Sequence, residues 1–86
     1  MPEVRWHRAA AEIVQLLPEP IADRIVLAAR LLGQFPAMGR RVHDPQWPNL
    51  RRVLAREGNV VYAYDPVADT VTIVAIVAPG TGRPVK

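Results

Sequence analysis

The 86-residue chain contains no cysteine and no serine, and its only lysine is Lys86. Without cysteine it can form neither a disulfide nor a thiolate metal site, which is compatible with a reducing cytoplasm. The absence of both residues also excludes serine and cysteine nucleophiles. No glycine-rich loop opens a helix, so a phosphate-binding loop is missing as well. We therefore expect no cofactor.

Long hydrophobic runs are also missing. The run Ile25–Gly33 is broken by Arg30 and is far shorter than a membrane span. The charged start Met1–Arg8 is not followed by an apolar region, which predicts no signal peptide. His7 and His43 are the only histidines, and their spacing matches no metal motif. The sequence predicts a cytoplasmic protein without a metal ion and without a membrane partner.

What the chain does have is a large apolar share for its size. Half of the residues are hydrophobic, the formal net charge is +3, and every basic residue except one is arginine. A chain this short buries only about 60–65% of the surface that its unfolded form exposes. We therefore expect part of the remaining apolar surface to lie against a partner.

Apolar residues at three-to-four spacing predict two helices at the start of the chain. The first covers residues 5–17 and ends at Pro18 and Pro20, because a proline pushes the residue before it out of the helical region. The second runs from Pro20 to about Gln34, with Phe35 at the end of its apolar stripe. So short a linker predicts an antiparallel helical hairpin.

The second half of the chain changes to period-two alternation, which predicts strands at 50–56, 59–64 and 70–77. The last of these is apolar on both faces in its second half, so we expect it to be central and doubly covered. Val4 and its neighbours form a further candidate edge strand. The expected fold is α+β, an N-terminal αα-hairpin packed on a small antiparallel sheet of three to four strands. We expect one domain over residues 1–78 and a flexible tail over 79–86.

A series of short motifs follows the same order. An early tryptophan and alanine precede an acidic–aliphatic pair, a helix that ends in F-P-x-x-G, an N-L-R motif, a V-V-Y strand and a V-x-I strand. These residues are Trp6, Ala9, Glu12-Ile13, Ala22, Leu32, Phe35–Arg40, Asn49–Arg51, Val60–Tyr62 and Val71–Ile73. Their order and spacing resemble the ParE/RelE superfamily of toxins from bacterial type II toxin–antitoxin modules, the ParE branch more than the RelE branch.

The resemblance implies the helical-hairpin-on-sheet fold and a cognate antitoxin that wraps the toxin and neutralises it. For ParE-like members it implies plasmid stabilisation and inhibition of DNA gyrase, and for RelE-like members cleavage of messenger RNA on the ribosome. Here the second strand opens Gly58-Asn59-Val60 without the basic residue of the RelE type. Our first interpretation is a gyrase inhibitor that is not an enzyme. The alternatives are a RelE-like endoribonuclease and a degenerate toxin that only binds its antitoxin.

Two sets of candidate site residues follow. A nuclease would use arginine to stabilise charge on the phosphate, and the candidates are Arg51, Arg52, Arg56 and Arg83. The candidate partner-binding residues are Met38, Arg40, Arg41, Trp47, Arg51 and Arg52. A solvated strand face is the competing interpretation for the arginines.

The aromatic residues leave two questions open. Trp47, in a proline-flanked loop, is either a lid on the core or an exposed anchor. Tyr62 and Tyr64 lie two apart and share one strand face, so they either pack under the helices or stack on nucleic-acid bases.

Overall fold

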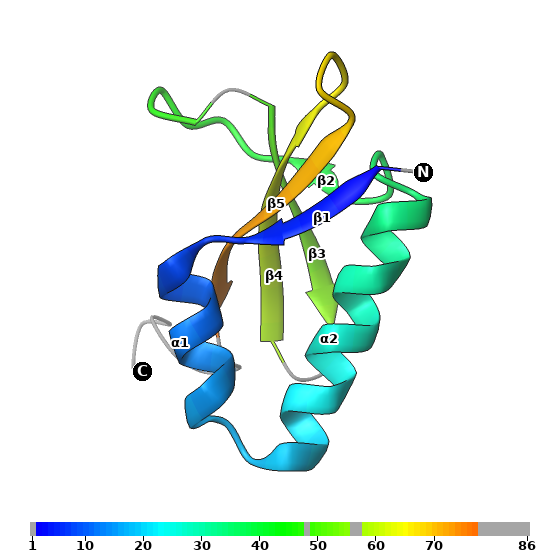
Figure 1. Ribbon diagram of the computed structural model, residues 1–86. Helices are drawn as coiled ribbons and strands as arrows, with labels where there is room; N and C mark the ends of the chain where they lie inside the picture. Colours follow the sequence, from blue (N-terminus) through cyan, green and yellow to red (C-terminus); the bar gives the residue numbers. More distant parts are fainter. Residues whose placement is uncertain (1, 48, 56–57, 78–86) are drawn as a thin grey trace.

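The computed structural model describes residues 2–47, 49–55 and 58–77 of the chain. Within these residues, two helices and five strands follow one another in the order shown in Figure 1. They are β1 Glu3–Trp6, α1 Arg8–Leu16, α2 Glu19–Gln34, β2 Arg40–Arg41, β3 Leu50–Ala55, β4 Gly58–Asp65 and β5 Thr70–Val77.

The strands form one five-stranded sheet in the order β1-β5-β4-β3-β2. β1 runs parallel to β5, and the other neighbours are antiparallel, with Tyr62 opposite both Arg51 on β3 and Ile73 on β5. The sheet is thus mixed and larger than the antiparallel sheet of three to four strands that the sequence predicted. β5 is paired on both sides, as expected of an interior strand.

The start of the chain differs from the sequence prediction. Arg5 and Trp6 were expected on the first helix, but they lie on β1, where Trp6 is opposite Ile73. The backbone N–H of His7 extends this pairing by donating to the Ile73 carbonyl at 2.8 Å. α1 begins only at Arg8, and the Nδ1 of His7 caps it by accepting from the Ala9 amide. Ladder hydrogen bonds to β5 therefore override a helical periodicity that continued to Arg5.

Two further features were not predicted. The two-residue strand β2 falls in a segment whose sequence carries no period-two pattern. Phe35, expected at the end of the buried stripe of the second helix, is exposed, because α2 ends at Gln34 and the chain turns there.

Both helices cover the same face of the sheet (Figure 1), and the core lies between the helices and that face. Leu32 and Ile25 from α2 meet Val60, Tyr62, Val71 and Ile73 from β4 and β5, and all six side chains are almost fully buried. The expected common core of helices and strands is therefore present. Tyr62 belongs to it, whereas Tyr64 is only half-buried, with its hydroxyl donating to the Asp69 carboxylate.

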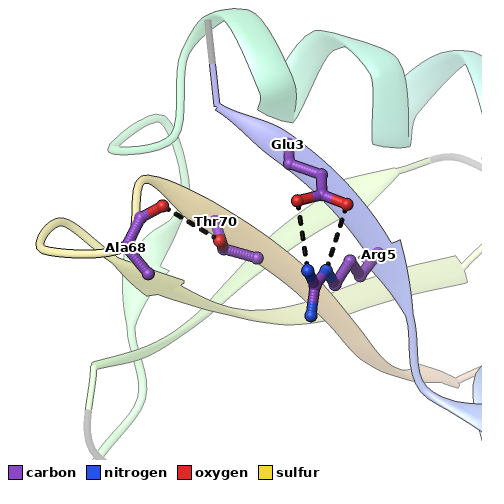
Figure 2. A network of polar contacts seen from close by, with 4 residues as sticks. All are labelled: Glu3, Arg5, Ala68 and Thr70. Atoms are coloured by element: carbon purple, nitrogen blue, oxygen red, sulfur yellow. Dashed lines mark hydrogen bonds and ion pairs between the residues drawn. The ribbon is translucent and has the colours of Figure 1, made fainter.

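The free edge of β1 carries charge. Glu3 and Arg5 lie two residues apart on the side away from the helices and form an ion pair, shown in Figure 2. In the same view Thr70 donates from its hydroxyl to the Ala68 carbonyl in the β4–β5 turn. Charged side chains on an edge strand discourage another chain from pairing with it.

The hydroxyl of Tyr62, a residue of the core beneath the helices, has two backbone hydrogen-bond partners. It donates to the Pro36 carbonyl at 2.7 Å and accepts from the Gly39 amide at 2.9 Å. Replacing Tyr62 by Phe leaves both groups without this partner, so we expect the free energy of unfolding to fall by about 1–3 kcal/mol. Chemical denaturation measures it. Tyr64→Phe is the matched control, because among the described residues its exposed hydroxyl bonds only to Asp69. An equal loss in both variants would contradict the prediction.

The same hydroxyl predicts a dependence of stability on pH. Burial raises the pKa of Tyr62 above its usual value of 10.0, against the smaller opposing effects of the Gly39 hydrogen bond and the Arg51 charge. The unfolded chain therefore loses this proton at lower pH than the folded one. The Tyr62 contribution is complete below pH 10.0 and is lost as the pH rises through the raised pKa. In denaturation curves between pH 8 and pH 11, roughly the range that brackets a phenol, wild type should lose more stability than Tyr62→Phe.

Candidate partner-binding surface

The turn between α2 and β2 is held from the sheet side by Tyr62. Its hydroxyl bonds fix Pro36 and Gly39, and the Met38 amide donates to the Phe35 carbonyl at 3.0 Å. Gly39 is buried, and a Cβ there would stand 2.8 Å from the Arg52 carbonyl and 2.7 Å from the Tyr62 hydroxyl oxygen. Glycine is thus required because neighbouring atoms occupy the space of a side chain. The turn presents Met38 and Arg40 in a fixed position.

Arg51 holds the same turn from the edge of the sheet. Its Nη1 donates to the Gly39 carbonyl at 2.7 Å and to the Ala37 carbonyl at 3.3 Å. Arg51 lies opposite the buried Tyr62, so its side chain leaves β3 on the face that the helices cover. The sequence placed Arg51 among both the partner-binding and the nuclease residues. The contacts instead describe a side chain that fixes the backbone of the turn.

Arg40 and Arg52 form a different pair. They are opposite one another across β2 and β3, so both point to the face without helices, and both are exposed. Neither guanidinium makes a hydrogen bond or ion pair within the described residues. Together with Met38 and Leu54, which is 80% exposed, they line a shallow hollow at the edge of the sheet. Two cations beside apolar side chains suit an acidic, partly apolar partner or a phosphate chain.

Trp47 lies on the segment that follows β2. In Figure 1 this segment passes behind the sheet from β2 toward the opposite edge. The indole of Trp47 meets the ring of His7 edge-to-face, with the ring centroids 6.2 Å apart. His7 follows β1 and Trp47 precedes β3, so the contact joins two segments that are far apart in the sequence. Trp47 is half-buried in this position and Leu50 is buried, which favours the lid over the free anchor.

Arg41 lies beside the segment that carries Trp47 and apart from the Arg40–Arg52 pair. It lines a hollow with Val42, His43, Asp44, Trp47, Asn49 and Leu50. Alternation along a strand sends Arg40 and Arg41 to opposite faces, so the six predicted partner-binding residues do not form one surface. Met38, Arg40 and Arg52 come together, while Arg41, Trp47 and Arg51 lie apart from them.

The remaining candidate chemistry is limited in the part of the chain that the structure describes. No group of three or more His, Asp or Glu side chains there could hold a metal ion. No helix among those residues is long and apolar enough to cross a membrane. Arg56 and Arg83, which the nuclease interpretation requires, lie outside the described residues.

Sequence reasoning missed the role of Leu54 in this surface. The strand alternation already placed Leu54 on the same face as Arg52, but the sequence did not say which face the helices would cover. The register opposite Tyr62 decides that question, since it places Arg51 on the covered side and Arg52 and Leu54 on the open side.

Comparison of the chain with known proteins assigns its fold. No protein-family model and no curated protein sequence matches the chain. Among solved structures, the RelBE2 toxin–antitoxin complex from Mycobacterium tuberculosis matches at a TM-score of 0.80 and 21% identity, over 91% of this chain and 99% of that one. The isolated RelE toxin from Escherichia coli matches at a TM-score of 0.79 and 10% identity, over 98% of this chain and 88% of the toxin. The chain has the RelE fold.

A third structure extends the comparison of the RelE fold to an archaeon. The RelE–RelB complex from Pyrococcus horikoshii matches at a TM-score of 0.78 and 17% identity, over 92% of this chain and 96% of that one. The resemblance to the ParE/RelE superfamily is thus confirmed at the level of the fold. The preference for the ParE branch is not resolved by these neighbours.

The two arginines of β3 allow a direct test of their different roles. Arg51→Ala removes the donor that holds the Ala37 and Gly39 carbonyls, and we expect it to lower the free energy of unfolding by about 1–2 kcal/mol. Arg52→Ala removes a side chain without such contacts and should change it by less than about 0.5 kcal/mol. Chemical denaturation of both variants checks this, and a larger loss for Arg52→Ala would reverse the assignment.

Proposed function

We propose that this chain is the toxin of a type II toxin–antitoxin pair. One observation carries the proposal: the fold match extends over 91% of this chain and 99% of a chain of the Mycobacterium tuberculosis toxin–antitoxin complex, and over 98% of this chain against an isolated toxin. A match over nearly the full length of both chains compares whole domains rather than a shared motif. The toxin function itself is carried over by analogy of fold.

The antitoxin partner is supported by the surface as well as by the neighbours. Two of the three structures compared are toxin–antitoxin complexes. In this chain the hollow at Met38, Arg40, Arg52 and Leu54 offers apolar side chains beside two cations. An antitoxin segment with alternating acidic and apolar residues would neutralise the arginines and cover Leu54.

For the cellular target, the RelE-like alternative has more support than gyrase. The neighbours are RelE proteins, and inhibition of DNA gyrase finds no support among them. We therefore propose that the target is messenger RNA on the ribosome. The Arg40–Arg52 pair would bind the RNA backbone, since each guanidinium can contact phosphate oxygens in a bidentate manner.

The chemistry that these residues can supply is electrostatic. An arginine beside the scissile phosphate stabilises the negative charge that develops in the transition state. Asn59 occupies the β4 position opposite Leu54, on the same open face as Arg52. It carries no positive charge, and its Oδ1 is buried without a hydrogen-bond partner among the described residues. Arg40 and Arg52 would therefore bear the main electrostatic role among the described residues of this face.

Incubating the chain with ribosomes that are translating a defined messenger RNA tests this proposal. Primer extension should show cuts that depend on the ribosome, and the double variant Arg40→Ala/Arg52→Ala should reduce cleavage by about tenfold or more. Arg8→Ala is the matched control, because Arg8 is an exposed arginine on α1 whose one ion pair in the described part of the chain is with Glu12.

The opposite outcome is equally specific. Inhibition of gyrase-driven supercoiling by the purified chain, with the messenger left intact, would overturn the RNA target and support the ParE-like interpretation. Growth that is unaffected by expression of the chain, together with tight binding of its antitoxin, would leave only a degenerate toxin.

A further inference from the structure

The outward face of α2 carries apolar residues that no part of the described chain covers. Leu27 is 56% exposed and Leu31 is 47% exposed, and Phe35 continues the same line one turn beyond Leu31. The side chains that pack on the sheet, among them Ile25 and Leu32, project from the other side of the helix. In Figure 1 α2 lies at the outside of the molecule, on the same side of the sheet as α1.

The charges on one flank of this face are arranged by sign. Asp23 and Arg30 are seven residues apart, almost two complete turns, so they lie on one line with Leu27 between them. Glu19 lies on the same side in the first turn, so this flank carries acidic side chains toward the N-terminus and Arg30 toward the C-terminus. The exposed Arg24 lies on the opposite flank, beyond Leu27. Asp23 and Arg30 have no ion pair within the described residues. A shallow hollow lies among them, lined by Asp23, Val26, Leu27 and Arg30.

This arrangement is complementary to itself. If a second α2 packs antiparallel across a two-fold axis between residues 26 and 27, Asp23 of one copy lies opposite Arg30 of the other, and the reverse pair forms as well. Glu19 then lies opposite Gln34, and Leu27 from each copy meets at the axis. A parallel arrangement would instead place like charges together.

We propose that this chain forms a symmetric homodimer through the outward face of α2, with Leu27 at its centre and two Asp23–Arg30 ion pairs across the interface. A contact between two helices of this length lies at or below the small end of specific protein interfaces. The dimer should therefore exchange with monomer at about micromolar concentration. It forms away from the Arg40–Arg52 face and so does not depend on the proposed function.

Sedimentation velocity of the purified full chain, at concentrations from about 1 to 500 µM, measures the dimer. Asp23→Arg should weaken it by about tenfold or more, because the substituted side chain would bring a second positive charge against Arg30 of the other copy. Arg30→Asp should weaken it similarly. The double exchange Asp23→Arg/Arg30→Asp should restore the affinity to within about threefold of wild type, because the pairs re-form with opposite polarity. Circular dichroism confirms that each variant is folded.

The apolar centre has its own variant and control. Leu27→Asp should abolish the dimer, whereas Leu16→Asp should not, since Leu16 is 85% exposed on α1 and lies outside this face. A wild-type chain that stays monomeric over the whole range overturns the proposal, as does a double exchange that remains folded and monomeric. If Leu27→Asp instead weakens only the complex with a cognate antitoxin, the face belongs to the antitoxin and the homodimer is refuted.

Discussion

The hydroxyl of Tyr62 is the contact on which the surface of this molecule depends. It lies in the core on β4 and reaches the backbone of Pro36 and Gly39, 26 and 23 residues earlier in the chain. Arg51 on the neighbouring strand holds the same turn from its other side. Because a buried polar group must find a partner, the turn cannot move without leaving the phenol unsatisfied. The position of Met38 and Arg40 at the sheet edge is therefore determined in the core.

The two faces of the sheet differ in the side chains that they present. One face receives both helices and supplies the buried cluster around Leu32 and Ile73. The other face is partly crossed by the segment that carries Trp47 and otherwise presents the Arg40–Arg52 pair. Because side chains alternate along β3, two adjacent arginines point to opposite faces: Arg51 holds the turn on the covered face, and Arg52 is exposed on the open face.

Most of the architecture could be predicted from the sequence, because the helices and the three long strands each have a clear period. β5 was predicted with its observed bounds, and the proline break between the helices with it. β1 could not be predicted in full, since its stability comes from pairing with β5, at the far end of the described chain. β2 is too short to show any period. For the candidate site, the sequence named Arg40 and Arg52 but could not separate them from Arg41 and Arg51, because the face that the helices cover is a property of the packed structure.

The parallel pairing of β1 with β5 has a consequence for how the protein is made. Glu3 lies opposite Thr70, so β1 cannot pair with its neighbour until β5, the last of the described strands, has been synthesised. Contacts this distant in sequence slow folding, because the chain loses the entropy of closing a long loop before the stabilising contacts form. Until then, the nascent helices can pack only on the sheet formed by β2, β3 and β4, and the core still lacks the side chains of Val71 and Ile73.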